Sequence, residues 1–130
     1  MKQSSAMLDE LREVIEKAWT ADTSADPLGW SLENPAWGQC AVTALLIQDS
    51  FGGELLRADV DGISHYWNRL PSGEEVDLTR HQFRGTAVVS RAELRERSYV
   101  LSFPETRKRY QRLKSRIRGI AWSETTPQQA

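Results

Sequence analysis

The sequence predicts an α+β domain in which a buried helix precedes a small antiparallel sheet and helices lie at both ends of the chain. Helical patterns span residues 4–19 and 104–120, and a nearly continuous apolar segment lies at 38–51. Short alternating segments separated by turn residues follow that apolar segment. With 130 residues, 39% of them hydrophobic and 27% charged, the chain has the composition of an ordinary globular domain. We expect one domain over 1–122 and a flexible polar tail at 123–130.

The first helix is amphipathic, because Leu8, Leu11, Ile15 and Trp19 form one apolar stripe at helical spacing. Residues 20–37 then lose all periodicity and collect Asp, Gly, Asn and Pro. Loops of this length inside a compact domain are usually functional or partly disordered. We consider this loop a candidate lid over the residues that follow it.

The apolar segment at 38–51 predicts a helix buried in the middle of the domain, since apolar residues occur nearly all round it. Gly52 and Gly53 are typical of the left-handed end of a helix. Cys40 therefore falls in the first helical turn.

Three strands are expected next, at 54–60, 64–70 and 74–78. The turn Pro71–Gly73 suits a three-residue hairpin loop, which pairs Leu70 with Glu74 and Trp67 with Asp77. Because side chains alternate along a strand, His65 and Asp77 then share one face as diagonal neighbours. We expect a hydrogen bond between them.

The last third of the chain predicts a short helix at 90–97, a short strand at 99–103 and a final helix that begins at Pro104. Residues 1–77 carry a net charge of −9 and residues 78–130 one of +8. This asymmetry indicates either a basic binding tail or two halves that attract each other on folding.

Cys40, His65 and Asp77 are the residues from which chemistry can be built. A thiol in the first turn of a helix is close to the positive end of the helix dipole and to unpaired backbone N–H groups, which favour a thiolate. A cysteine, a base and an acid that orients the base are the recurrent parts of nucleophilic catalysis. The structural alternatives are a cysteine that packs as a small apolar residue, a packed histidine and an acid that caps a turn.

The same residues carry a resemblance to a known family. The segments 37–42 (WGQCAV), 65–68 (HYWN) and 77–79 (DLT, with Gln82 shortly after) resemble the nucleophile, histidine and aspartate segments of transglutaminases, in the same order. The resemblance implies a papain-like core, in which a buried helix bearing the cysteine packs on a sheet that bears the other two residues. It implies Cys40 as nucleophile, His65 as base and Asp77 as orienting acid. From 34 to 83 the chain is also similar to the YunG-like group of small bacterial proteins.

Four further residues are candidates for contacting the substrate or a developing oxyanion. Trp37 either donates its indole N–H to the oxyanion or packs in the core. Gln39 either polarises the attacked carbonyl or points away from it. Trp67 and Asn68, in the histidine segment, complete the set.

We interpret the chain as a cysteine-dependent acyl-transfer enzyme that forms a thioester on Cys40 and releases it to water or to an amine. The alternative is a non-catalytic interaction module that binds a partner through its basic C-terminal helix.

No metal or other cofactor is expected, since two histidines do not assemble a metal site and no calcium-loop pattern occurs. A protein or peptide substrate is expected, without nucleic-acid or membrane partners. One free cysteine and no secretory segment favour a reducing, cytoplasmic location, and the sequence leaves the oligomeric state open.

Overall fold

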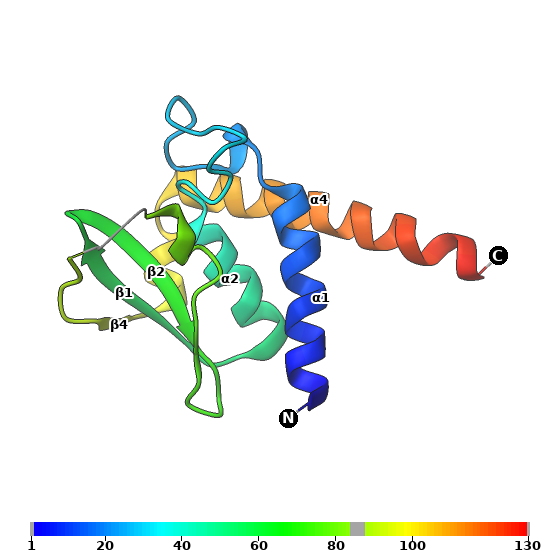
Figure 1. Ribbon diagram of the computed structural model, residues 1–130, viewed down its shortest axis with the longest axis horizontal. Helices are drawn as coiled ribbons and strands as arrows, with labels where there is room; N and C mark the ends of the chain where they lie inside the picture. Colours follow the sequence, from blue (N-terminus) through cyan, green and yellow to red (C-terminus); the bar gives the residue numbers. More distant parts are fainter. Residues whose placement is uncertain (1, 84–87, 130) are drawn as a thin grey trace.

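The computed structural model describes residues 2–83 and 88–129. They form an α+β fold in which helix α2 lies between a four-stranded antiparallel sheet and helices α1 and α4 (Figure 1). The helices are α1 (Lys2–Ala18), α2 (Cys40–Phe51), α3 (Arg97–Leu101) and α4 (Pro104–Gln129), with short 3-10 turns η1 (Ala21–Thr23) and η2 (Arg80–Gln82). The strands are β1 (Glu54–Val60), β2 (Ile63–Arg69), β3 (Glu75–Val76) and β4 (Glu93–Arg95), in the order β3-β2-β1-β4.

The predicted hairpin between β2 and β3 is confirmed, including its register. Asn68 pairs with Val76, and the backbone N–H of Leu70 donates to the carbonyl of Glu74 at 2.8 Å. The regular part of β3 covers two residues rather than the predicted 74–78. The register still brings Asp77 opposite Trp67, next to the strand that carries His65.

Helix α2 forms the centre of the core, as its apolar sequence predicts. Its residues 42–47 are all buried, and they pack with Ile15 of α1, Leu55 of β1 and Leu113 of α4 in one hydrophobic cluster. The helix ends where predicted, because Gly52 and Gly53 have φ angles of 75° and 85°. A Cβ on Gly53 would lie 2.2 Å from the carbonyl oxygen of Arg69, so the start of β1 packs closely against the end of β2.

The secondary structure predicted for residues 90–103 is wrong, because helix and strand are exchanged. Residues 93–95 form an edge strand on β1 instead of a helix, and residues 97–101 form helix α3 instead of a strand. The sequence of 93–97 has good helix formers, but the outer edge of β1 offers unpaired backbone groups, and pairing with them outweighs the local preference. The turn into α3 then follows at Glu96, whose backbone is extended.

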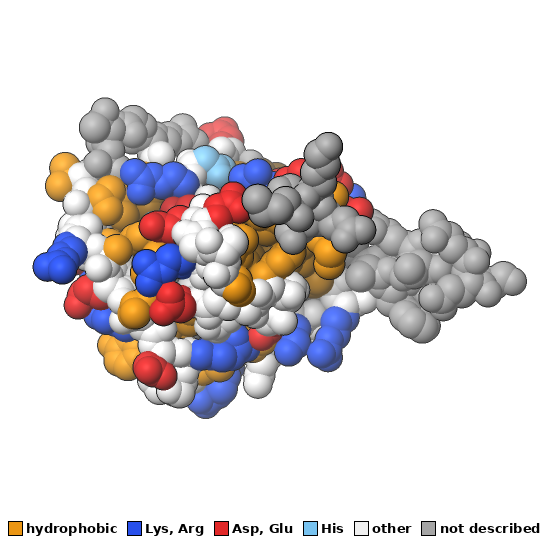
Figure 2. All heavy atoms as spheres, turned by 90° about the horizontal axis from the view of Figure 1, so that it is seen from below, with side chains coloured by type: hydrophobic (Ala, Val, Ile, Leu, Met, Phe, Trp, Pro, Cys, Tyr) orange, Lys and Arg blue, Asp and Glu red, His pale blue; other side chains and the backbone are white. Residues whose placement is uncertain are grey.

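Helix α4 begins at Pro104, as predicted, and continues to Gln129, beyond the expected end near residue 120. Residue 130 of the expected tail lies outside the described residues. Ion pairs join the basic second half of the chain to its acidic first half: Arg116 contacts Asp22 at 3.2 Å, and Arg97 contacts Asp49 at 2.7 Å. On the face shown in Figure 2, acidic and basic side chains are interspersed. The charge asymmetry therefore contributes to attraction between the two halves.

Within the described part of the chain, no helix has both the length and the apolar character that crossing a membrane requires.

Candidate active site

Cys40 is the first residue of α2, and a sharp turn before it sets its position. Gly38 has a φ of 73°, and a Cβ there would lie 2.2 Å from the hydroxyl oxygen of Ser24 and 2.8 Å from the backbone nitrogen of Ala25. The turn therefore requires glycine. The Cys40 side chain is half-buried, and its Sγ atom lies 3.8 Å from the carbonyl oxygen of Ser64 in β2. The thiol is thus next to the strand residue that precedes His65, at the positive end of the helix.

His65 is fully buried and is held on three sides. Its Nε2 atom lies 2.6 Å from Oδ2 of Asp77, which is the hydrogen bond that the predicted register requires. The Trp67 ring stacks on the imidazole at a centroid distance of 5.7 Å. The Phe83 ring meets it edge-on at 5.0 Å. The imidazole orientation is therefore fixed by packing as well as by the carboxylate.

Asp77 is itself oriented by the residue two positions on. Its Oδ1 atom accepts hydrogen bonds from the backbone N–H of Thr79 at 3.2 Å and from the Thr79 hydroxyl at 3.4 Å. Oδ2 is then directed at His65. Because a carboxylate only accepts, it holds a ring proton on Nε2, and the other ring nitrogen, Nδ1, lies 3.4 Å from Nε2 of Gln82.

The pKa of His65 is raised from 6.5 to about 9. Burial of the imidazole lowers the pKa, but this is outweighed by the hydrogen bonds to Asp77 and Cys40 and by the negative charge of both groups. The imidazolium is therefore the stable form of His65 at neutral pH.

Gln82 connects the turn before Cys40 to His65, a role that the sequence alone does not indicate. It is buried; its Oε1 atom accepts from the backbone N–H of Gly38 at 3.0 Å, and its Nε2 atom lies 3.4 Å from Nδ1 of His65. Its backbone carbonyl accepts from the side chain of Asn34 at 3.1 Å. The only sequence signal for this residue was its place in the segment that begins at Asp77.

Comparison with known proteins shows which family the chain belongs to. The family model described as "YunG protein" matches residues 7–121. The chain belongs to the YunG family. It is 35% identical over 77 residues to the "Uncharacterized protein YunG" of Bacillus subtilis strain 168, a match that covers 59% of this chain and 64% of the relative. The aligned part is thus less than two thirds of the relative's length, and no solved structure matches the chain significantly.

Two of the other predicted residues have their polar groups directed at the loop that precedes α2. Gln39 is fully buried; its Oε1 accepts from the hydroxyl of Thr23 at 2.8 Å and its Nε2 donates to the carbonyl of Thr20 at 3.0 Å. The indole N–H of Trp37 donates to Asp26 at 3.0 Å. In this YunG-family chain both side chains anchor the loop, which is folded against the domain rather than open.

Trp67 and Asn68 point to different parts of the fold. The Trp67 ring packs on His65, while its indole N–H donates to Glu75 at 2.8 Å. Asn68 is buried and donates to the backbone oxygen of Ala44 at 2.9 Å, so it fastens β2 to the middle of α2. Trp67 thus contacts the candidate site directly, and Asn68 holds the strand that carries it.

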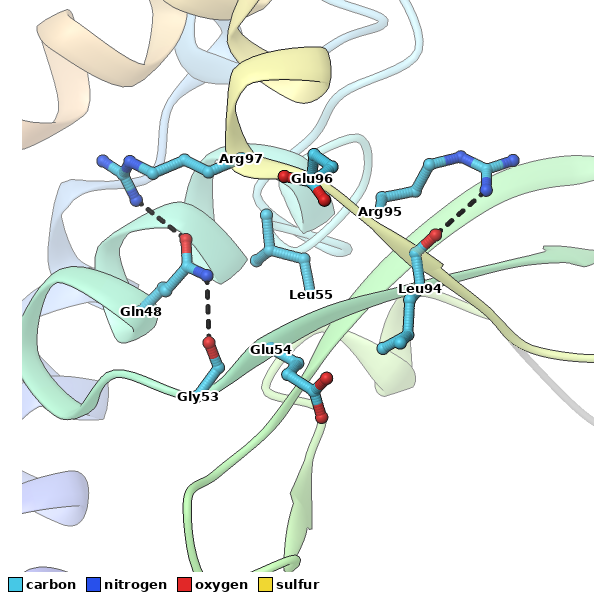
Figure 3. Close-up of a pocket in the computed structure, with 8 residues that line it drawn as sticks. All are labelled: Gln48, Gly53, Glu54, Leu55, Leu94, Arg95, Glu96 and Arg97. Carbon is cyan, nitrogen blue, oxygen red and sulfur yellow. Dashed lines mark hydrogen bonds between the residues drawn. The ribbon is translucent and has the colours of Figure 1, made fainter.

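A separate pocket of about 320 Å³ lies near the other end of α2 (Figure 3). Gln48 of α2 and Arg97 at the start of α3 lie next to each other on one side of it, joined by a hydrogen bond of 3.0 Å. Cys40 and His65 do not line this pocket. Over residues 2–83 and 88–129, no three His, Cys, Asp or Glu side chains are grouped as a metal ion would need.

Proposed function

We propose that the chain is a cysteine-dependent acyl-transfer enzyme of transglutaminase-like type, with a papain-like core and a Cys40–His65–Asp77 triad. The observation that carries the proposal is the buried His65 imidazole, which lies 2.6 Å from the Asp77 carboxylate and follows Ser64, whose carbonyl oxygen is 3.8 Å from the Cys40 thiol at the start of α2. A buried histidine needs partners, but a structural role does not require one partner to be a thiol at a helix N-terminus.

In the proposed reaction the Cys40 thiolate attacks the carbonyl carbon of an amide or ester. The backbone N–H groups of the first turn of α2, which have no partner one turn earlier in the helix, stabilise the oxyanion that forms. The His65 imidazolium gives its Nδ1 proton to the leaving group as the carbonyl re-forms, and a thioester remains on Cys40. Water or an amine then attacks the thioester, His65 takes up its proton, and the Cys40 thiolate leaves.

Protein or peptide substrates fit this chemistry, since their amide bonds and glutamine side chains are acyl donors of the required kind. Hydrolysis, deamidation and amine crosslinking share the first step and differ in the group that attacks the thioester. The alternative of a non-catalytic module with a free basic helix is less well supported, because Arg112 and Arg116 of α4 are both bound to Asp22.

The first test is alkylation of Cys40 by iodoacetamide at about pH 6.5, where an ordinary thiol is almost entirely protonated. Cys40 is the only cysteine, so the rate of mass increase reports on this site alone. We expect Cys40 to react faster than a model peptide thiol, and His65→Gln to slow it by about tenfold. His81→Gln is the matched control, because His81 is the other histidine of the chain and is exposed.

The second test is acylation by p-nitrophenyl acetate, followed by mass spectrometry. We expect an acetyl group on Cys40 that hydroxylamine removes and that His65→Gln fails to form. A thiol no more reactive than the model peptide would contradict an activated nucleophile. A reactive thiol that takes up no acetyl group would contradict acyl transfer.

A further inference from the structure

Three arginines on one face of α4 differ in their partners. Arg109, Arg112 and Arg116 follow one another at helical spacing. Arg112 donates to the backbone oxygen of Asp22 at 2.6 Å, and Arg116 contacts the Asp22 carboxylate at 3.2 Å. These two positive charges are therefore engaged by the loop that follows α1.

Arg109 has no such partner within the described part of the chain. Its Nε atom is buried and forms no hydrogen bond there, and its Nη2 atom donates to the hydroxyl of Thr106, one turn earlier, at 3.2 Å. No carboxylate among the described residues forms an ion pair with it. A guanidinium that loses water is normally matched by an acid or by full hydrogen bonding, because an unpaired buried donor is costly. Arg109 therefore has a hydrogen-bond donor, its Nε–H group, that no described residue accepts.

The face of α4 that carries Arg109 lies close to the residues that lead into Cys40. Helix α4 packs against α2, whose first residue is Cys40. Burial lowers the pKa of Arg109, and the negative charges of Glu105 and Cys40 act in the opposite direction. Arg112 acts on Arg109 in the opposite sense. Arg112, one turn further along this face, donates to the backbone oxygen of Asp22 at 2.6 Å, and the next residue, Thr23, donates to Gln39, which precedes Cys40, at 2.8 Å. These contacts bring this face of α4 beside the start of α2.

We propose that Arg109 binds a carboxylate of the molecule that reacts with Cys40. This role rests on the proposed function and narrows its substrate class to acyl donors that carry a carboxylate close to the reacting carbonyl. In a peptide substrate that group is an acidic side chain or a free C-terminus.

The chemistry of the guanidinium favours a carboxylate. The N–H groups of Nε and of the adjacent Nη atom form a planar fork that matches the two oxygens of a carboxylate. Partial burial strengthens the interaction, because water screens it less than at the surface. A bound carboxylate would satisfy the Nε donor that is otherwise unpaired.

The test compares two alkylating reagents that differ in charge. Iodoacetamide is neutral, whereas iodoacetate carries a carboxylate on the carbon that the thiolate attacks. An isolated thiolate repels iodoacetate and reacts with it more slowly. We expect Cys40 to show a higher iodoacetate-to-iodoacetamide rate ratio than a model peptide thiol, and Arg109→Gln to lower the ratio by about five- to tenfold. Added salt is expected to lower the wild-type ratio by screening.

Lys108→Gln is the matched control, since it removes one positive charge from the adjacent, exposed position of the same helix. We expect its ratio to equal that of the wild type. Arg109→Lys keeps the charge without the planar fork, so an intermediate ratio is expected, and this variant serves if Arg109→Gln does not fold.

The outcomes separate this role from the proposed function. A Cys40 that is slow with both reagents contradicts the activated thiol itself. A fast Cys40 whose rate ratio is unchanged in Arg109→Gln, or is lowered equally in Lys108→Gln, overturns carboxylate recognition by Arg109 and leaves the triad standing.

Discussion

Replacing Asp77 by Asn removes the carboxylate that supports the His65 imidazolium while preserving size and shape. The Asn side-chain oxygen can still accept from Thr79, as Oδ1 of Asp77 does at 3.2 Å. The amide nitrogen then faces Nε2 of His65, where a carboxylate oxygen lay at 2.6 Å. Two donors now face each other when the ring is charged, so the imidazolium loses its strongest partner.

The size of the effect follows from that contact. A hydrogen bond to a charged group contributes about 1.5–3 kcal/mol, which corresponds to about 1–2 pKa units. The pKa of His65, about 9 in the wild type, should therefore fall to about 7–8 in Asp77→Asn. In the proposed mechanism the thiolate of Cys40 then has less imidazolium beside it above about pH 7.

The assay is the iodoacetamide rate of Cys40 as a function of pH. We expect Asp77→Asn to lower the rate most at about pH 8, by about two- to tenfold, because the ring is mostly charged there in the wild type and at least half neutral in the variant. The part of the profile that follows His65 should shift to lower pH by the pKa change given above. Glu75→Gln is the matched control, because Glu75 lies on the same strand edge and bonds Trp67 rather than His65. A profile for Asp77→Asn that superimposes on that of the wild type would refute this account of the site.

The same contact predicts how stability depends on pH. The folded pKa of His65 is above its ordinary value of 6.5, so the protonated ring contributes its full stabilisation below about pH 6.5 and loses it as the pH rises through about 9. The contribution is at most about 3 kcal/mol, from the difference between the two pKa values. In Asp77→Asn the loss should be smaller and should occur at lower pH, which urea unfolding at several pH values measures.

Two further predictions concern the supports of the site. Gln82→Leu should slow alkylation of Cys40 several-fold and lower the free energy of unfolding by about 1–3 kcal/mol, because the N–H of Gly38 loses its acceptor. Gln82→Glu keeps that acceptor and should raise the pKa of His65. Equal pH profiles for the two variants would contradict the role given to Gln82. Gly53→Ala should cost more than Gly62→Ala in urea unfolding, although both glycines have positive φ. The backbone strain of about 1–2 kcal/mol is common to both, but only at Gly53 would the new Cβ meet a carbonyl oxygen, at 2.2 Å. Equal losses would show that the close approach to Arg69 relaxes at no cost.

The sequence predicted best those features that depend on neighbouring residues. The turn Pro71–Gly73 and the alternation on either side of it determine the β2–β3 register, and this register brings His65 to Asp77. The helix end at Gly52 is equally local, because it depends on the conformations open to glycine.

The features that the sequence did not predict depend on pairings between distant segments. Residues 93–95 contain helix-forming residues but pair with β1, which is more than thirty residues earlier in the chain. The polar contacts of Gln39 and Gln82 likewise join segments 16 to 44 residues apart. Nothing in the local pattern indicates which of many possible acceptors a glutamine will bind.

Amide side chains position the parts of the candidate site, whereas charged side chains affect its reactivity. Gln82 joins the turn at Gly38 to His65, and Asn68 joins the strand of His65 to the helix of Cys40. Their hydrogen bonds are directional, so they fix geometry, but they are neutral and add no net charge beside Cys40. Asp77 and Arg109 instead act through charge, one on the base and one on the incoming molecule. Replacing an amide by a neutral residue should therefore change how fast Cys40 reacts with both alkylating reagents alike. Substitution of Asp77 should instead move the pH profile, and substitution of Arg109 should change the preference between reagents.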